Sequence, residues 1–305
     1  MDLGTSMLRV LQAVAENGSV SAAARALGYS QSAVSRQVSS AERQLGHVLF
    51  ERTTVGMQPT RAGTVLLRHV SAALRELQDA AVALDHGAAT NPPLRLGAFP
   101  SAAAVFLPSA IQALRVAGID VITRQASTPA LVRAVRAGTL DYAFVSQRPP
   151  FRPLDDQTPA LGFQPLLDTT LMLAVAANGT LGRAATVSAE QAAAALWVAP
   201  PASTQDAHLG VWPGLPGRPR VAHRAADWLT RLQIVAVDGG VTTIPGPEMA
   251  RLVPGVKAVT ITGIPPEVRR IGLLRAAGAG YTGRERAEAA LHSVFDDSLD
   301  PGRAS

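Results

Sequence analysis

The stretch that decides the fold is GSVSAAARALGYSQSAVSRQVSSAERQLG, residues 18–46. Ser19 or Ser21 can cap a short alanine-rich helix, which ends at Gly28. After a turn of about four residues, Ser30 caps a second helix that continues almost to the end of this stretch. Two helices joined by so short a turn predict a helix-turn-helix, an arrangement that can place one helix in the major groove of DNA.

The second of these helices, over 31–45, has two different sides. Its apolar stripe faces the core at helical spacing and consists of Val34, Val38, Ala41 and Leu45. The opposite side carries a single acid, Glu42, whereas a merely solvated side usually carries Glu and Lys. Gln and Arg can bind base edges with two hydrogen bonds, and Ser suits phosphates or bases. The candidate DNA contacts on this side are Gln31, Ser32, Ser35, Arg36 and Ser39, with Arg43 beside them.

The flanking segments complete a winged domain. An earlier helix carries apolar residues at helical spacing from Met7 to Val14. Two short strands, over 48–53 and 57–59, predict a wing that brings Arg52 close to the phosphate backbone or the minor groove. Between residues 25 and 68 there are six arginines and two acids. This local charge excess is consistent either with phosphate contact or with an arginine-rich solvated surface.

A long helix is expected from Thr60, and Gly87 ends it. It carries an apolar heptad seam of Leu67, Val70, Leu74, Leu77, Ala81 and Leu84. Such a seam predicts a partner helix and therefore a dimer, although packing against the chain's own globular domain is the alternative. The small residues and prolines over 88–93 then predict a hinge.

The remaining two hundred or so residues alternate strands and helices, which predicts an α/β fold with a parallel sheet. The first set is expected as strand, helix, strand, helix, strand over 94–98, 105–116, 119–125, 129–137 and 140–145. A second set has strands over 170–176, 196–199, 220–223 and 240–244, with helices over 188–195 and 227–237. A late strand over 271–275 and a helix over 283–295 return to the first set.

Hydroxyl side chains follow several of these strands. Ligands of open α/β sheets bind beyond the carboxyl ends of the strands, where helix N-termini offer free N–H groups. The candidate effector residues are Ser101, Ser127, Thr128, Ser203 and Thr204. Each of them could instead be an ordinary helix cap. Arg148 or Arg152 could add positive charge for an acidic effector.

Composition excludes several classes of protein. The chain has 305 residues, of which 47% are hydrophobic and 17% charged, with a net charge of +5 and no cysteine. Disulfide scaffolds and Cys-ligated metal sites are therefore excluded. We expect a cytoplasmic location, because the N-terminal sequence does not resemble a signal peptide and no apolar run approaches the roughly 20 residues of a membrane span. The histidines are isolated and no phosphate-binding or dinucleotide loop is complete. We expect no enzyme activity, metal or cofactor.

The N-terminal motifs resemble those of LysR-type transcriptional regulators. The similarity is carried by GSVSAAARAL (18–27), SQSAVSRQV (30–38), LFER (49–52) and PTRAG (59–63), with Glu42 and the Leu45-Gly46 pair between them. Looser matches follow at LRLGA (94–98), LVRAVRAGTLD (131–141) and GVTTIP (240–245). By this resemblance, Gln31, Ser35 and Arg36 correspond to recognition-helix contacts, and Arg52 to the wing arginine.

The resemblance implies a winged helix-turn-helix over residues 1–59, a linker and dimerisation helix with its hinge over 60–90, and an effector-binding domain over 91–305. The latter would resemble a type 2 periplasmic binding protein, with lobe I over about 91–163 and 266–300 and lobe II over about 164–265. Implied partners are double-stranded DNA with an interrupted palindromic operator, a second copy of the chain in a homodimer or homotetramer, a small-molecule effector, and RNA polymerase as a further candidate.

Two other classes compete with this interpretation. A purely architectural DNA-binding protein would have no use for the α/β sets after Pro93. A solute-binding protein or an enzyme with an appended helical domain would call for a signal peptide or a catalytic constellation. The sequence therefore favours a one-component regulator, in which effector binding shifts an equilibrium between oligomer shapes.

Overall fold

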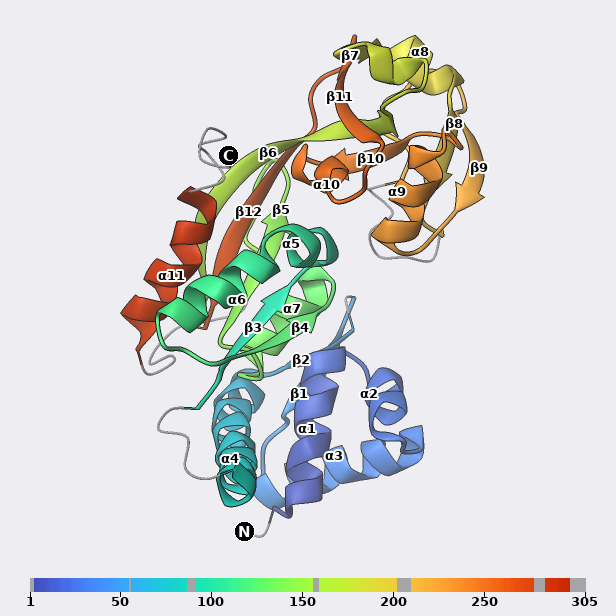
Figure 1. Ribbon diagram of the computed structural model, residues 1–305. Coiled ribbons are helices and arrows are strands. Elements are labelled where there is room, and N and C mark those ends of the chain that lie inside the picture. The colour runs from blue at the N-terminus through green and yellow to red at the C-terminus, as the bar shows by residue number, and fades with distance from the viewer. Residues whose placement is uncertain are drawn as a thin grey trace.

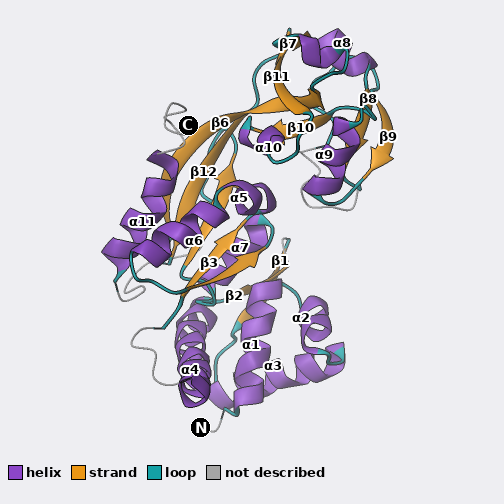
Figure 2. Cartoon of the chain, in the orientation of Figure 1, coloured by secondary structure: helices purple, strands orange, loops and turns teal. Residues whose placement is uncertain are grey.

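The computed structural model describes residues 3–54, 56–86, 92–155, 159–201, 210–276 and 283–296. Three bodies follow one another in space: a helical N-terminal domain, a lobe built around a twisted sheet, and a second lobe beyond it (Figure 1). Helices dominate the N-terminal domain, and strands lie in both lobes and in the connection between them (Figure 2). The α/β class and the two-lobed architecture expected from the sequence are confirmed.

The N-terminal domain has the predicted winged helix-turn-helix. Its elements are α1 (Thr5–Asn17), α2 (Val20–Leu27), α3 (Gln31–Leu45), β1 (Phe50–Thr53) and β2 (Gly56–Pro59). The Ser19 side chain accepts from the backbone N–H of Ala22, and the Ser30 side chain accepts from Ala33. Each of the first three helices ends at a glycine in the left-handed conformation, as the sequence predicts.

The long helix α4 (Arg61–His86) divides the predicted heptad seam into two halves. Leu67, Val70 and Leu74 are buried within this chain, and Leu67 belongs to the core of the N-terminal domain. The expectation that all six seam residues await a partner helix is therefore corrected for these three. Leu77 is 56% exposed and Leu84 is 88% exposed, and Ala81 between them is exposed too. The hinge predicted over 88–93 lies largely outside the described residues.

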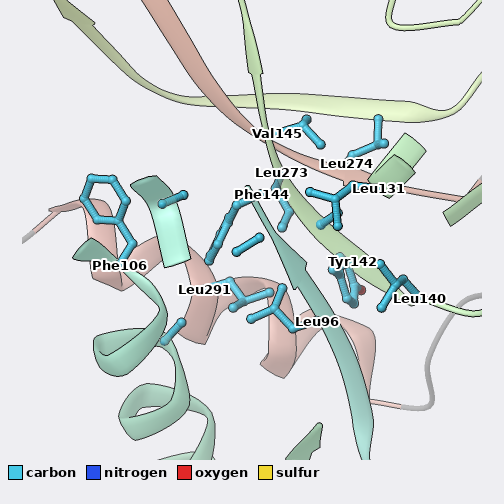
Figure 3. Close-up of a cluster of buried hydrophobic side chains, with 14 of the residues drawn as sticks. Leu96, Phe106, Leu131, Leu140, Tyr142, Phe144, Val145, Leu273, Leu274 and Leu291 are labelled. Atoms are coloured by element: carbon cyan, nitrogen blue, oxygen red, sulfur yellow. The ribbon is translucent and has the colours of Figure 1, made fainter. Parts of the chain in front are cut away.

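Lobe I contains the predicted parallel strands, with one extra helix. Its first part is β3 (Leu94–Ala98), α5 (Pro100–Val105), α6 (Leu107–Val116), β4 (Val121–Gln125), α7 (Thr128–Arg136) and β5 (Tyr142–Gln147). The sequence predicted one helix over 105–116, whereas the structure has α6 there and a further helix, α5, before it. Phe106 is both the C-cap residue of α5 and the N-cap residue of α6. β3 pairs in parallel with β4 and β5. A core of Leu, Phe, Val and Tyr side chains fills the space between this sheet and the surrounding helices (Figure 3).

Two long strands connect the lobes: β6 (Gly162–Ala176) leaves lobe I and β12 (Val268–Arg275) returns to it, followed by α11 (Arg284–Asp296). β12 lies between β5 and β6 and is antiparallel to both. The sequence predicted only the second half of β6, because its first half is interrupted by Gln164, Pro165 and Asp168. These two strands join the lobes.

Lobe II is wrapped around the far end of β6. It contains a 3₁₀ turn (Leu181–Arg183), β7 (Thr186–Ser188), α8 (Ala189–Ala194), β8 (Leu196–Ala199), β9 (Arg220–Arg224), α9 (Trp228–Ala236), β10 (Thr242–Pro245), α10 (Glu248–Arg251) and β11 (Val256–Thr262). The sequence did not predict β7, β11 or α10. Both β10 and β11 pair antiparallel with β6, and two apolar clusters lie in this lobe.

The N-terminal domain packs against lobe I through α7. The guanidinium Nε of Arg133 donates to the carbonyl oxygen of Glu16 at 2.9 Å, and the Glu16 carboxylate pairs with Arg124 at 3.2 Å. Ala137, at the end of α7, is buried in the core of the N-terminal domain, and its carbonyl oxygen accepts from the Ser71 hydroxyl. The helix therefore contacts both α1 and α4.

Candidate DNA-binding surface and effector site

The predicted reading side of α3 is open to solvent. Gln31, Ser32, Ser35 and Arg36 are exposed, and Ser39 is half-buried. A hollow of about 370 Å³ runs along this side and is lined by Ser32, Ser35, Arg36, Ser39 and Arg43. Gln31, at the start of the helix, lies outside the lining. Four of the side chains that the sequence assigned to DNA, Ser32, Ser35, Arg36 and Ser39, thus line one hollow, whose chemistry suits base edges and phosphates.

The single acid of α3, Glu42, is turned toward the wing. Its carboxylate accepts from the backbone N–H groups of Leu49, at 2.8 Å, and Phe50, at 3.4 Å. It therefore holds the first strand of the wing against α3. Because the carboxylate is engaged there, the hollow on α3 is lined by serines and arginines alone.

The wing is fixed at its turn as well. Arg52 lies opposite Met57 in the two-stranded ladder and its side chain is exposed. The Met57 backbone N–H donates to the Gly18 carbonyl at 2.7 Å. Gly56 has a φ of +114°, and a Cβ there would lie 2.5 Å from the same Gly18 oxygen. Only glycine fits this contact, which ties the wing to the turn before α2.

Positive charge is concentrated on the surface of this domain. All six arginines between residues 25 and 68 are exposed, and within the described part of the chain none of them forms an ion pair: Arg25, Arg36, Arg43, Arg52, Arg61 and Arg68. In lobe I, by contrast, most of the arginines with a described ion pair are neutralised by that lobe's own carboxylates. The surface around α3 is therefore available to an external polyanion.

Three of the five candidate effector residues lie at the carboxyl ends of the lobe I strands. Ser101 lies in α5, which Phe99 caps, and Ser127 is the N-cap of α7 but makes no side-chain capping bond. The Thr128 hydroxyl accepts from the backbone N–H of Ser146 at 3.4 Å. None of the three is an ordinary side-chain cap, which was the alternative. Ser203 and Thr204 lie outside the described residues.

One residue of this region was not anticipated from the sequence. Arg269 on β12 is only 5% exposed, its Nη2 donates to the Ser146 hydroxyl at 2.9 Å, and its guanidinium lies 4.7 Å from the Phe99 ring centre. We refer to Phe99, Ser101, Thr128, Ser146 and Arg269 as the strand-end cluster. Nothing in the sequence distinguishes Arg269 from the many other arginines, because its partners are more than a hundred residues away.

The two arginines that the sequence did propose are placed differently. Arg148 and Arg152 both follow β5, and Arg152 is exposed. The Arg152 carbonyl oxygen accepts from the Gln147 side chain at 2.9 Å, so its backbone holds the end of β5. Among the described residues there is no group of three or more acidic, His or Cys side chains that could hold a metal ion. No described helix has the length and apolar character of a membrane span.

A winged helix-turn-helix joined to a two-lobed α/β domain defines a regulatory DNA-binding protein with an attached binding domain. Two family models match the chain: the bacterial regulatory helix-turn-helix protein of the lysR family over residues 5–64, and the LysR substrate binding domain over residues 87–287. The chain belongs to the LysR family of transcriptional regulators.

Individual relatives agree with this assignment. A probable hydrogen peroxide-inducible genes activator of Mycobacterium avium is 32% identical over 246 residues, 78% of this chain and 76% of that protein. The HTH-type transcriptional regulator YofA of Bacillus velezensis is 38% identical over 140 residues, which is 45% of this chain and about half, 49%, of the relative.

Solved structures show the same fold at low identity. A full-length OxyR variant from Pseudomonas aeruginosa has a TM-score of 0.59 and 20% identity, covering 97% of this chain and 95% of that one. Full-length CbnR, in complex with its target DNA, has a TM-score of 0.52 and 20% identity, covering 95% and 99%.

Proposed function

We propose that this chain is a sequence-specific regulator that reads an interrupted palindromic operator through α3 and the wing. The observation that carries this proposal is the exposed face of α3, on which Ser32, Ser35, Arg36 and Ser39 line one hollow while the neighbouring Glu42 is engaged by the wing. Gln31 and Arg36 read bases in this proposal, and Arg52 contacts the backbone.

Two copies of the chain would be needed to read a palindrome. The exposed half of the α4 seam, formed by Leu77, Ala81 and Leu84, supplies an apolar strip for the partner's helix. The strip is continuous with the buried half of the same seam, so that a second helix could extend the packing already present in one chain. The light-scattering measurement described below distinguishes a dimer from a tetramer.

The strand-end cluster is the effector site in this proposal. Two relatives carry names that refer to hydrogen peroxide, and reversible thiol oxidation is the usual chemistry of a cysteine-based peroxide sensor. This chain contains no cysteine. A thiol-based signal is therefore excluded for this sequence, and in our proposal the signal is a bound small molecule that is sensed without enzymatic turnover.

Footprinting tests the proposal. The full chain is incubated with the intergenic DNA beside its own gene, and light scattering records its oligomeric state in the same buffer. We expect two protected half-sites whose centres are about 10 base pairs, or a multiple of that spacing, apart. Equal protection along all of the DNA would indicate an architectural binder, and no protection at low salt would contradict a DNA-binding role.

A further inference from the structure

A cavity of about 620 Å³ lies between the N-terminal domain and lobe I, and we call it the interdomain cavity. Its walls come from α1, the end of α2, α4, the strands β3 and β4, and the residues Gly138 and Thr139 that follow α7. None of the five residues of the strand-end cluster lines it, so the two places are separate. The volume falls within the roughly 300–1,000 Å³ of small-molecule sites.

Positive charge predominates on the walls of this cavity. Among the described residues that line it there is one acid, Glu16, against four arginines from four different elements: Arg9, Arg75, Arg95 and Arg124. Glu16 is paired with Arg124 at 3.2 Å. Asp141, behind the wall, accepts from Arg75 at 2.9 Å. Two carboxylates against four guanidinium groups leave an excess of positive charge around an open volume, which attracts anions.

Two of the arginines at this interface hold the two domains together. Arg133, outside the cavity, donates to the carbonyl oxygen of Glu16 at 2.9 Å. Arg75 donates to the carbonyl oxygen of Gly138 at 2.8 Å as well as to its carboxylate partner. Arg9 differs from both, because it is exposed on α1 and forms no hydrogen bond or ion pair with any described residue. Its charge is not used by the fold.

The cationic groups lie at two ends of the same wall. Arg9 and Glu16 are seven residues apart on one side of α1, which places them roughly 10 Å apart at 1.5 Å per residue. Arg124 lies at the Glu16 end, where only its Nη1 is engaged within the described part of the chain. A guanidinium has five N–H donors, so Arg124 can bind Glu16 and a further acceptor together.

We propose that the interdomain cavity is a second ligand site, apart from the proposed effector site, and that it binds a small molecule with two or more phosphate or carboxylate groups. Arg9 binds one anionic group and Arg124 binds another, each through charge-assisted hydrogen bonds. A ligand with a single anionic group reaches one end of the wall only. Because the ligand contacts α1 and β4 at once, its binding stabilises the packing of the N-terminal domain on lobe I. The inference depends neither on the operator nor on the strand-end cluster.

Calorimetry on the full chain tests this with fructose 1,6-bisphosphate and with citrate, in about 0.15 M salt, where long-range attraction to exposed charges is screened. Fructose and citric acid triamide are the matched neutral probes, and acetate is the probe with one anionic group. We expect one of the two larger anions to bind once per chain, at least tenfold more tightly than acetate, and to raise the melting temperature. The phosphate and carboxylate probes distinguish the two ligand sources. Failure of both anions to bind, or equal binding of the neutral probes, would overturn the proposal.

Variants locate the bound anion. Arg9→Gln removes no contact of the fold, so it should keep the melting temperature of the unliganded wild type and weaken anion binding at least fivefold. Arg68→Gln, at an exposed site of α4 outside the cavity, should leave the affinity unchanged. Equal affinities in the two variants would indicate general attraction to a basic surface and would overturn the proposal.

A second copy of the chain is the competing occupant, because the exposed side chains of Leu77 and Ala81 line the open side of the cavity. Leu84→Asp, on the same exposed strip but outside the cavity, separates the two occupants. We expect the wild type and this variant to bind the anion with the same affinity. Binding by the variant alone would show that the partner's α4 fills the cavity in the dimer, and the ligand site would be refuted.

Discussion

The clearest test of the DNA-binding surface compares Arg36→Ala with Arg52→Ala. Both side chains are exposed and neither forms an ion pair within the described residues, so both variants should keep the folding stability of the wild type to within about 0.5 kcal/mol. Any change in DNA affinity then reports on contact with DNA. Arg36 lies in the hollow of α3 and Arg52 lies on the wing, so the two substitutions are expected to reduce DNA binding in different ways.

Loss of a base contact by Arg36→Ala is expected to cost about 1–3 kcal/mol for each half-site, roughly 5- to 150-fold in the dissociation constant, and largely to spare random DNA. Arg52→Ala is expected to weaken binding to both kinds of DNA. It should also reduce the slope of log affinity against log salt by about 0.9 for each half-site, or about 1.8 for a dimer on two half-sites.

Fluorescence anisotropy with an operator obtained by in vitro selection and with a scrambled duplex, at four salt concentrations, measures both quantities. Equal losses of Arg36→Ala on the two duplexes would refute its role in base recognition. An unchanged salt slope for Arg52→Ala would show that the wing arginine does not contact the phosphate backbone.

Three further predictions concern the oligomer and stability. Leu84→Asp should convert a dimer into a monomer by light scattering, whereas Val116→Asp, at another exposed apolar helix position, should not; a dimer in both would remove the α4 interface. Glu42→Ala leaves two backbone N–H groups at the start of the wing without their acceptor and should cost roughly 2 kcal/mol in urea unfolding, whereas Glu51→Ala, at an exposed site, should cost almost nothing. A hydrogen bond from a backbone N–H in the first turn of α9 holds the pKa of Asp227 below its ordinary value of 3.8, so its stabilisation is present above that pH and is lost as the pH falls through the lowered pKa. Asp227→Ala should accordingly cost about 1 kcal/mol at pH 7 and progressively less in acid, and a pH-independent difference would contradict the capping role.

The N-terminal domain could be predicted almost to the residue because its signals are local. Each cap and the glycine that ends each helix lie within a few positions of the element that they define, as Ser30 and Gly46 do for α3. The apolar stripe of α3 was equally predictable, since Val34 and Val38 are set by helical period alone.

The remaining features depend on contacts between distant residues. The periodicity of α4 indicates an apolar seam but not what covers it, and Val70 and Leu74 turned out to be buried by the chain itself. In the strand-end cluster, Arg269 and Ser146 are 123 positions apart, so that no window of sequence contains both. The hydroxyls could be proposed because they follow strands, whereas the guanidinium belongs to a strand that crosses back from the other lobe.

The short helix α7 has a mechanical consequence. It contains nine residues, which makes it about 14 Å long at 1.5 Å per residue. The hydroxyl of its first residue, Thr128, accepts from the backbone N–H of Ser146 at the end of β5, and Arg133 and Ala137 near its other end are bonded to Glu16 of α1 and Ser71 of α4. A helix of about two and a half turns moves as one body, so that a displacement of one end of α7 also displaces its other end. If the candidate effector residues bind a ligand as proposed, α7 is the single short helix between that site and the domain that carries α3, and a tilt of α7 would change how the N-terminal domain lies against lobe I.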